Sequence, residues 1–409
     1  MLRPNKERVN SLIAGIAEFG KTASGNTRLA YSAEDNAAIQ WLLKQVEDLG
    51  LQISEDTVGN VFLRRPGYDS AAKPIAMGSH LDTVAHGGAY DGIVGVISAL
   101  ETMYMLRNEQ LKHTLETIIF RAEESTRFGF ATIGSKLMTG SGTPQQFSSA
   151  AKQNDKTFEE CLRENGYDPT RYKEAIKKQD CYKCFLEVHI EQGKVLDETG
   201  DAIGIVQNIA APTRFKLIIE GLADHSGATP MGFRKDALVA GAKLILAIEQ
   251  AAVLEATQGT VATVGVVDIE PSSINVIPGQ VVLWVDVRGV DETSIALVLS
   301  EIAKSCQQVE NADNMKIQRE MLTQDHPVPL NDEITKLLLE ICHKQGIKAR
   351  VMNSGAGHDA MHMAKLVPTG MIFIPCRKGI SHNPAEYVSI EEIITGIEVL
   401  AEAIYRLAK

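Results

Sequence analysis

The middle of the chain opens with the apolar segment Phe215-Lys216-Leu217-Ile218-Ile219-Glu220, which is typical of a β-strand. Periodic segments of the types helix, strand, strand, helix and strand follow it, in this order: Lys235–Val253, Thr260–Asp268, Gln280–Arg288, Glu292–Val309 and Lys316–Met321. The resulting βαββαβ order is the split βαβ arrangement of ferredoxin-like domains. Because such a unit is a complete fold, we expect it to be inserted into another domain.

The flanking segments predict an α/β domain that this insert splits in sequence. Before the insert, apolar strands are expected at 61–64, 75–79, 115–122 and 185–190, with amphipathic helices among them. After it, the alternation resumes with a helix at 332–344, strands at 351–353 and 371–375, and a last helix from Ile390. We therefore predict a two-domain α/β protein in which a mixed-sheet catalytic domain, residues 1–211 and 328–409, surrounds an inserted domain, residues 212–327.

Composition is that of an ordinary globular protein and excludes some partners. The 409 residues are 44% hydrophobic and 23% charged, and the net charge is −11, with acidic and basic residues interspersed. Nucleic acid is an unsuitable partner because the basic stripe that it needs is missing. No apolar run approaches the roughly 20 residues that span a bilayer. The start, Met1-Leu2-Arg3-Pro4-Asn5-Lys6, lacks the apolar core of a signal peptide, so we expect a cytoplasmic location.

Imidazole and carboxylate groups stand at strand ends and in loops, namely His80, Asp91, Glu124, His189 and His382. Open α/β sheets bind ligands at the carboxyl ends of their strands, and donors of these types hold hydrolytic metal pairs. Taken singly, each residue has an ordinary interpretation as a structural histidine, a solvated acid or a helix N-cap. Their coincidence at several independent positions favours a metal site.

Two further acids are candidates for roles beside the metals. Glu123 and Glu124 are adjacent on an extended segment, so their side chains point in different directions. One carboxylate can bind a metal while the other faces the water that the metal holds. Asp82 stands two residues after His80, where it can accept a hydrogen bond from the second imidazole nitrogen and fix the tautomer.

Seven motifs run nearly from end to end: Thr27-Arg28-Leu29, Gly78-Ser79-His80-Leu81-Asp82-Thr83-Val84, Val188-His189-Ile190-Glu191-Gln192-Gly193, His225-Ser226-Gly227-Ala228-Thr229-Pro230-Met231, Ile274-Asn275-Val276-Ile277-Pro278-Gly279, Ser354-Gly355-Ala356-Gly357-His358-Asp359 and Ser381-His382-Asn383-Pro384-Ala385-Glu386. With them the chain resembles the dinuclear-zinc aminoacylase and carboxypeptidase-type amidohydrolases. Within these it is similar to the branch of N-carbamoyl-L-amino acid hydrolases, allantoate amidohydrolases and β-ureidopropionases. The segments at His189 and His225 are specific to that branch, since peptidase branches usually carry a carboxylate in place of His189.

The resemblance implies a two-metal centre. Asp91 would bridge two divalent ions, with His80 and His189 completing one coordination sphere and Glu124 and His382 the other. Zinc is expected, although a site rich in oxygen and imidazole donors also takes manganese, cobalt or nickel.

The resemblance also implies catalytic and substrate contacts. Glu123 would be the general base. Arg288, at the end of an apolar strand, offers a fork that matches a substrate carboxylate, and Asn275 can donate to the same group. His225 would stabilise the oxyanion in the active site of a partner subunit, which makes a homodimer the expected assembly. Contacts on the ureido side of the substrate are implied for Gln192, Gly357 and His358.

We predict an amidohydrolase that converts an N-carbamoyl-L-amino acid to the amino acid, ammonia and carbon dioxide. Allantoate hydrolysis, a dipeptidase or N-acyl-amino-acid deacylase, and a catalytically silent binding protein are the alternatives. Against allantoate, Ala211-Pro212-Thr213-Arg214-Phe215 stands where allantoate enzymes carry an Arg pair and a preceding Gln, and Ala122 where they tend to have a third acid. A silent protein would not need all five ligands and the base.

Overall fold

The computed structural model describes residues 3–148 and 156–409. The chain forms two compact units, of which unit 1 comprises residues 1–207 and 329–409 and unit 2 comprises residues 208–328. The predicted domain boundaries lie after residues 211 and 327. Residue 211 is already the first residue of strand β9 in unit 2.

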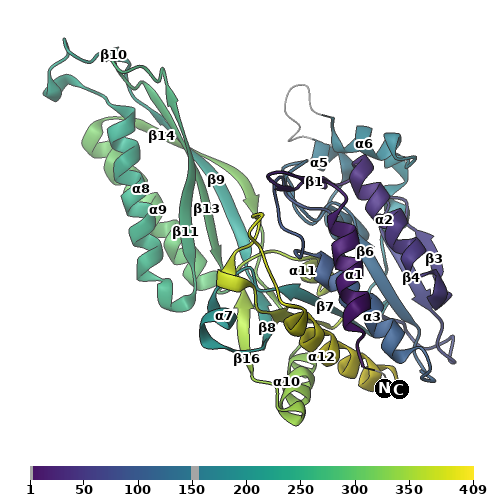
Figure 1. Ribbon diagram of the computed structural model, residues 1–409. Helices are drawn as coiled ribbons and strands as arrows, with labels where there is room; N and C mark the ends of the chain where they lie inside the picture. Colours follow the sequence, from purple (N-terminus) through teal and green to yellow (C-terminus); the bar gives the residue numbers. More distant parts are fainter. Residues whose placement is uncertain (1–2, 149–155) are drawn as a thin grey trace. The chain divides into compact units, whose positions relative to one another are not determined.

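Unit 2 has the predicted βαββαβ order. Its elements are β9 (Ala211–Glu220), α8 (Ala237–Leu254), β11 (Val261–Glu270), β13 (Gln280–Gly289), α9 (Glu292–Asp313) and β14 (Lys316–Gln324). The strands form an antiparallel sheet in the order β11-β13-β9-β14, and α8 and α9 lie side by side along one face of it (Figure 1). A separate ribbon pairs β10 (Asp224–His225) with β12 (Val276–Ile277).

Helix α8 is buried on one side and apolar on the other. Leu244 and Ile248 pack with Phe215 and Leu283 of the sheet in the core of unit 2. Within residues 3–148 and 156–409, α8 is the single helix that meets the length and composition of a membrane span, with 18 residues and a mean hydropathy of 1.8. A core helix of this composition meets the same test, and its buried face is the one that holds the sheet.

Unit 1 is built on a nine-stranded mixed sheet in the order β15-β8-β17-β7-β5-β6-β4-β3, with β16 paired to β8. Its strands are β3 (Gln52–Glu55), β4 (Val61–Arg65), β5 (Ile75–His80), β6 (Leu115–Phe120), β7 (Cys184–Ile190), β8 (Ile203–Ile209), β15 (Val328–Pro329), β16 (Ala349–Ser354) and β17 (Thr369–Ile374). The central strands β17, β7, β5 and β6 are parallel, and the flanking pairs β17–β8, β6–β4 and β4–β3 are antiparallel. The predicted mixed-sheet α/β class is therefore confirmed.

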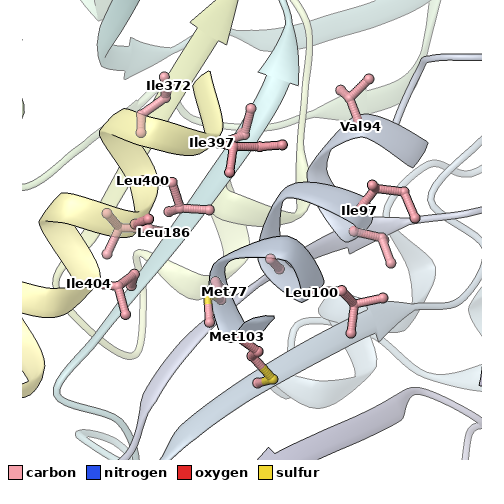
Figure 2. Packing of buried hydrophobic residues seen from close by; sticks show 14 of the residues in the cluster. Met77, Val94, Ile97, Leu100, Met103, Leu186, Ile372, Ile397, Leu400 and Ile404 are labelled. Carbon is pink, nitrogen blue, oxygen red and sulfur yellow. The ribbon is translucent and has the colours of Figure 1, made fainter. Parts of the chain in front are cut away.

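The core of unit 1 lies between the parallel strands and the long helices. Helix α3 (Ile93–Leu106) is buried over its whole length, as its nearly continuous apolar sequence predicts. Figure 2 shows Val94, Ile97, Leu100 and Met103 of α3 beside Met77 and Leu186 of the sheet and side chains of α12 (Ile390–Ala408). The other helices of the unit are α1 (Lys6–Ala17), α2 (Ala33–Gln45), α4 (Ile133–Met138), α5 (Pro144–Ser148), α6 (Phe158–Glu164), α7 (Val195–Thr199), α10 (Asp332–Gln345) and α11 (Asp359–Met363). This packing fixes β5, β6 and β7, which end at the same edge.

Candidate metal centre

Three adjacent parallel strands bring three of the predicted ligands, His80, Glu124 and His189, to one edge of the unit 1 sheet. His80 ends β5 directly opposite Phe120, which ends β6, and His189 is the next-to-last residue of β7. The pair Glu123 and Glu124 follows β6 after a short turn. Parallel register therefore places imidazoles and carboxylates from distant parts of the sequence together, as the carboxyl-end rule predicts.

Asp91 stands at the centre of the cluster. Its Oδ1 lies 3.1 Å from His189 Nε2 and 3.6 Å from His80 Nε2. Its Oδ2 lies 3.3 Å from His382 Nε2, which is itself 3.4 Å from Glu124 Oε1. Two ligand groups, His80–Asp91–His189 and Asp91–Glu124–His382, thus share Asp91, and within each group the donor atoms lie within 4.8 Å of one another.

The imidazole tautomers suit metal binding. Nδ1 of His80 lies 3.0 Å from the main-chain carbonyl of Asp82, and Nδ1 of His189 lies 2.9 Å from that of Ile190. A carbonyl oxygen only accepts hydrogen bonds, so each Nδ1 carries the proton. The Nε2 lone pairs of both rings are left to face Asp91, which is the arrangement of metal-ligating histidines.

Asp82 fixes the His80 ring differently from the prediction. Its carboxylate Oδ1 is 3.6 Å from His80 Nδ1, too far for a hydrogen bond, and the main-chain carbonyl makes that bond instead. The carboxylate accepts the main-chain N–H groups of Glu123 at 3.2 Å and Glu124 at 3.0 Å. One buried aspartate therefore ties the loop after β5 to the two glutamates after β6.

Asp91 does not act as the helix cap that its position allowed. Gly92 is the N-cap of α3, with φ of 69° and no side-chain cap. A Cβ on Gly92 would lie 2.4 Å from the His80 ring, so the glycine admits both the positive φ and the close approach of the imidazole. The Asp91 side chain is left to face the three histidines.

The electrostatics show an excess of buried acid around these rings. Burial raises the pKa of Glu123 well above its usual value and that of Glu124 to about 7, and neighbouring carboxylates add to both shifts. Burial also acts to raise the pKa of Asp91, but His189, His382 and His80 hold it well below the usual range. Buried carboxylates need compensating positive charge. The donor set and this charge excess both fit divalent metal ions.

Asp91 receives hydrogen bonds that sequence reasoning did not assign. Gln192 Nε2 donates to Asp91 Oδ2 at 2.7 Å, and Ser381 Oγ donates to the same oxygen at 2.9 Å. Glu386 accepts the main-chain N–H of Tyr90 at 2.9 Å and that of Asp91 at 3.1 Å. The sequence feature that pointed to Glu386 is its position as the last residue of the motif Ser381-His382-Asn383-Pro384-Ala385-Glu386.

A third group of donors, Glu187, His189 and His358, shares His189 with the first group. The Nδ1 of His189 is bound to Ile190 and its Nε2 faces Asp91, so this ring serves the centre at Asp91. His358 packs its ring 4.5 Å from that of His189 and lies 2.9 Å from Ser354 Oγ through Nε2. It is almost wholly buried and supports the His189 ring, while its predicted ureido contact, like that of Gly357 in the preceding loop, stays a prediction.

The remaining predicted residues belong to unit 2 and lie at both ends of its sheet. His225 and Asn275 are neighbours in the β10–β12 ribbon, where Ser226 N donates to the Asn275 carbonyl. Arg288 is near the other end of β13, opposite Pro212, with Nε and Nη2 on Asp286 Oδ2 at 3.1 and 2.9 Å. Because a strand rises about 3.4 Å per residue, Gln280 at the ribbon end and Arg288 are roughly 27 Å apart. Arg288 and Asn275 therefore do not meet within one unit 2.

The exposed His225 is oriented as a hydrogen-bond donor. Its Nδ1 accepts the main-chain N–H groups of Gly227 at 3.0 Å and Ala228 at 3.1 Å. A neutral imidazole that accepts at Nδ1 carries its proton on Nε2. His225 thus presents an N–H group to its surroundings.

Comparison with known proteins places the chain in a family. Residues 76–406 match the model of Peptidase family M20/M25/M40. An uncharacterized hydrolase of Haemophilus influenzae is 40% identical over 99% of both chains. A ureidoglycolate hydrolase of Oryza sativa subsp. japonica is 38% identical over 93% of this chain and 80% of its own. An N-carbamoyl-L-amino acid amidohydrolase of Geobacillus stearothermophilus is 34% identical over 98% of both.

The fold of a solved structure matches this chain over its whole length. A hydantoinase/carbamoylase-family amidase of Burkholderia multivorans has a TM-score of 0.89 and 30% identity, covering 100% of this chain and 98% of that chain. The chain therefore belongs to Peptidase family M20/M25/M40, in its amidohydrolase branch. The prediction of a hydrolase that acts on linear amide C–N bonds is confirmed at this level.

Proposed function

We propose that the protein is a two-metal amidohydrolase that removes the carbamoyl group from N-carbamoyl-L-amino acids. The observation that carries this proposal is the pair of ligand groups that share Asp91, with Glu123 beside them. Glu123 Oε2 lies 3.6 Å from His80 Nε2 and is bound to neither group, as a general base next to a metal must be.

Two divalent ions would occupy these groups, one at His80, Asp91 and His189 and the other at Asp91, Glu124 and His382. When bound, such a pair supplies Lewis acidity and makes hydroxide available at neutral pH. We infer zinc from the family resemblance, with manganese, cobalt and nickel as ions that the same donors accept.

Glu123 would carry the proton of the reaction. Its carboxylate accepts a proton from the attacking water and delivers it to the amino-acid nitrogen as the bond from that nitrogen to the carbamoyl carbon breaks. The amino acid leaves as the free amine, and the carbamic acid formed at the carbamoyl carbon decomposes to ammonia and carbon dioxide. Asp82 holds the main chain of Glu123 and Glu124, so the base and the adjacent ligand keep a fixed separation.

Gln192 supports a ureido group as the substrate. Its Nε2 donates to Asp91 Oδ2, and because a carboxylate only accepts, this contact fixes the orientation of the amide. Its Oε1 is then buried with no hydrogen-bond partner among residues 3–148 and 156–409. A buried acceptor of this kind is costly unless a ligand supplies the donor. The N–H groups of a carbamoyl substrate are such donors, and a plain acyl group has none at that position.

The positions of Arg288 and Asn275 support a homodimer. Both are proposed to bind the substrate carboxylate, and they lie at opposite ends of the unit 2 sheet. Two copies of the chain resolve this, since each site can take Arg288 from one subunit and the ribbon with His225 and Asn275 from the other.

Unit 2 has a surface that suits such a dimer. Val239, Leu246 and Val253 of α8 recur every seven residues and are 52%, 66% and 59% exposed. This is the spacing of a helix–helix seam. Strand β11, next to α8, is an edge strand with Val261 and Val266 exposed, so it is open to pairing with a second β11. Association would cover both features.

Chelation is expected to abolish turnover, because Glu123 has no activated water without the metals. Activity should return on adding zinc, manganese, cobalt or nickel, with two equivalents per subunit at saturation. Elemental analysis alongside an ammonia-release assay makes this measurement. Full turnover by a protein shown to be metal-free would contradict the two-metal proposal.

A substrate screen tests the proposed reaction itself. The protein, loaded with each metal in turn, is offered N-carbamoyl-L-amino acids, allantoate, dipeptides and N-acetyl amino acids while ammonia and free amine are followed. Ureidoglycolate is included as a second candidate, because a relative of 38% identity carries that name and the molecule also combines a ureido group with a carboxylate. Release of ammonia and amino acid is expected from the carbamoyl compounds. Cleavage of dipeptides or N-acetyl amino acids alone would refute the ureido specificity.

A further inference from the structure

Helix α11 begins directly after His358 and is joined to the start of α4 by two polar contacts. Ser135 Oγ donates to Asp359 Oδ1 at 2.6 Å, and Thr132 Oγ1 lies 2.9 Å from His362 Nε2. The partners are three residues apart on each helix, so the contacts form a pair along one face of each. All four side chains are buried. We call these four residues the α4–α11 clasp.

The clasp is connected to the proposed base through the main chain. Thr132 N donates to the carbonyl of Glu123 at 2.6 Å, and the next N–H, that of Ile133, donates to Ala122 at 2.9 Å. The start of α4 therefore binds the segment that presents the two glutamates. A shift of Thr132 would move the Glu123 main chain with it.

The backbone of this connection is held away from its common conformations. Ala122, just before Glu123, has φ of 54°, and Thr132 has φ of 57°. The left-handed region is unfavourable for a β-branched residue such as threonine. Conformations of this kind persist where surrounding contacts over-determine them. The clasp supplies such contacts at Thr132.

The donor and the acceptor in the contact between Thr132 and His362 can be assigned. Thr132 Oγ1 has one proton, which it donates to the Ala131 carbonyl at 2.7 Å. His362 must then donate from Nε2 to Thr132 Oγ1, and its buried Nδ1 has no partner in the described part of the chain. Burial of the His362 imidazole with only one hydrogen bond is costly. We infer that the bond from Nε2 to Thr132 is needed.

The same helix reaches the strands that carry the metal ligands. Ala360 N donates to Glu187 Oε2 at 3.0 Å, and Glu187 Oε1 accepts from Ser79 Oγ at 2.7 Å. Ser79 precedes His80, and Glu187 is two residues before His189. Helix α11 is thus fixed to β5 and β7 on one side and, through the clasp, to the glutamate segment on the other.

We propose that the clasp residues Asp359, His362, Thr132 and Ser135 are positioning residues that set the place of Glu123 relative to the metal ligands. This inference rests on the proposed role of Glu123 as the base. None of the four belongs to either ligand group. Their function is to hold the Glu123 carboxylate where it meets the attacking water. This placement must be accurate, because a displacement of about 1 Å costs roughly a hundredfold in rate.

Paired substitutions test the clasp. His362→Asn removes the Nε2 contact, whereas His362→Gln places an amide nitrogen near the position of Nε2. Asp359→Ala removes the acceptor for Ser135, whereas Asp359→Asn keeps Oδ1. We expect kcat to fall roughly tenfold to a hundredfold in His362→Asn and Asp359→Ala, with KM changed by less than about twofold and metal content intact. The Gln and Asn variants should recover most of the rate.

A matched control separates positioning from stability. Met363→Ala opens a cavity in the same buried helix without touching the clasp, so it should lower Tm and leave kcat of the folded protein unchanged. If His362→Asn likewise lowered Tm and left kcat unchanged, the clasp would only stabilise the fold and the inference would be wrong. Loss of metal in parallel with kcat would overturn it as well, because the ligands and not the base would then depend on the clasp.

Glu123→Gln in the same assay distinguishes this inference from the function it rests on. An inactive Glu123→Gln protein together with fully active clasp variants would remove the clasp and leave the base. An active Glu123→Gln protein would remove the base itself and the role of the clasp with it.

Discussion

A Glu123→Gln protein is expected to lose turnover by about 10²–10⁴-fold while it keeps its metal. Glutamine preserves the size of the side chain and a hydrogen-bonding group but cannot accept the proton of the attacking water. The side chain is 3.6 Å from His80 Nε2 and belongs to neither ligand group, so metal binding does not depend on it. Ammonia release and elemental analysis on the same sample measure the two quantities.

Glu124→Gln is the matched control, since the two residues are adjacent and equally buried. Glu124 Oε1 is one of the donors beside His382, so this variant should lose bound metal first and activity as a consequence. Both variants should lose turnover, and their metal content therefore distinguishes the role of Glu123 from that of Glu124. If Glu123→Gln lost metal and Glu124→Gln kept it, the two roles would have to be exchanged.

The strands that carry the ligands could be predicted because sequence and environment agree there. Each of Ile75–His80, Leu115–Phe120 and Cys184–Ile190 is a short apolar run that is buried over its whole length. Polar residues that end such runs stand out, and parallel register brings their positions together. In contrast, all four residues of β3 (Gln52–Glu55) are exposed at the edge of the sheet, so no alternation marked it as a strand.

Contacts that depend on the loop backbone could not be predicted. The proximity of Asp82 to His80 in sequence indicated a side-chain bond, yet the loop turns the main-chain carbonyl toward the ring and the carboxylate toward the glutamates. Glu386 binds main-chain N–H groups almost three hundred residues earlier, and its place in the Ser381–Glu386 motif does not identify that partner. The family resemblance implies that Arg288 and Asn275 bind one carboxylate, while the strand register that separates them is a property of the folded sheet.

A co-expressed mixture of the two inactive parents His225→Ala and Glu123→Gln is expected to recover about a quarter of wild-type activity through the mixed dimers that form. His225→Ala alone should lose roughly 10²–10³-fold through the missing oxyanion donor, and Glu123→Gln alone should be nearly inactive. In the proposed dimer each site combines the Glu123 of one subunit with the His225 of the other. Random pairing makes about half of the dimers mixed, and each mixed dimer has one complete site of two.

The apolar ribbon around His225 is the physical reason to expect that the partner takes this residue. Met231, Phe233 and Ile274 in its loops are 79%, 80% and 103% exposed. Exposed apolar side chains that cluster in this way are typical of a surface that binds another protein. Differently tagged parents, co-expressed and purified through both tags, give the mixed dimer directly. His326→Ala, at an exposed histidine of unit 2 outside the ribbon, is the control and should be fully active both alone and mixed. If purified mixed dimers stayed as inactive as their parents, His225 would act within its own subunit or have no part in catalysis.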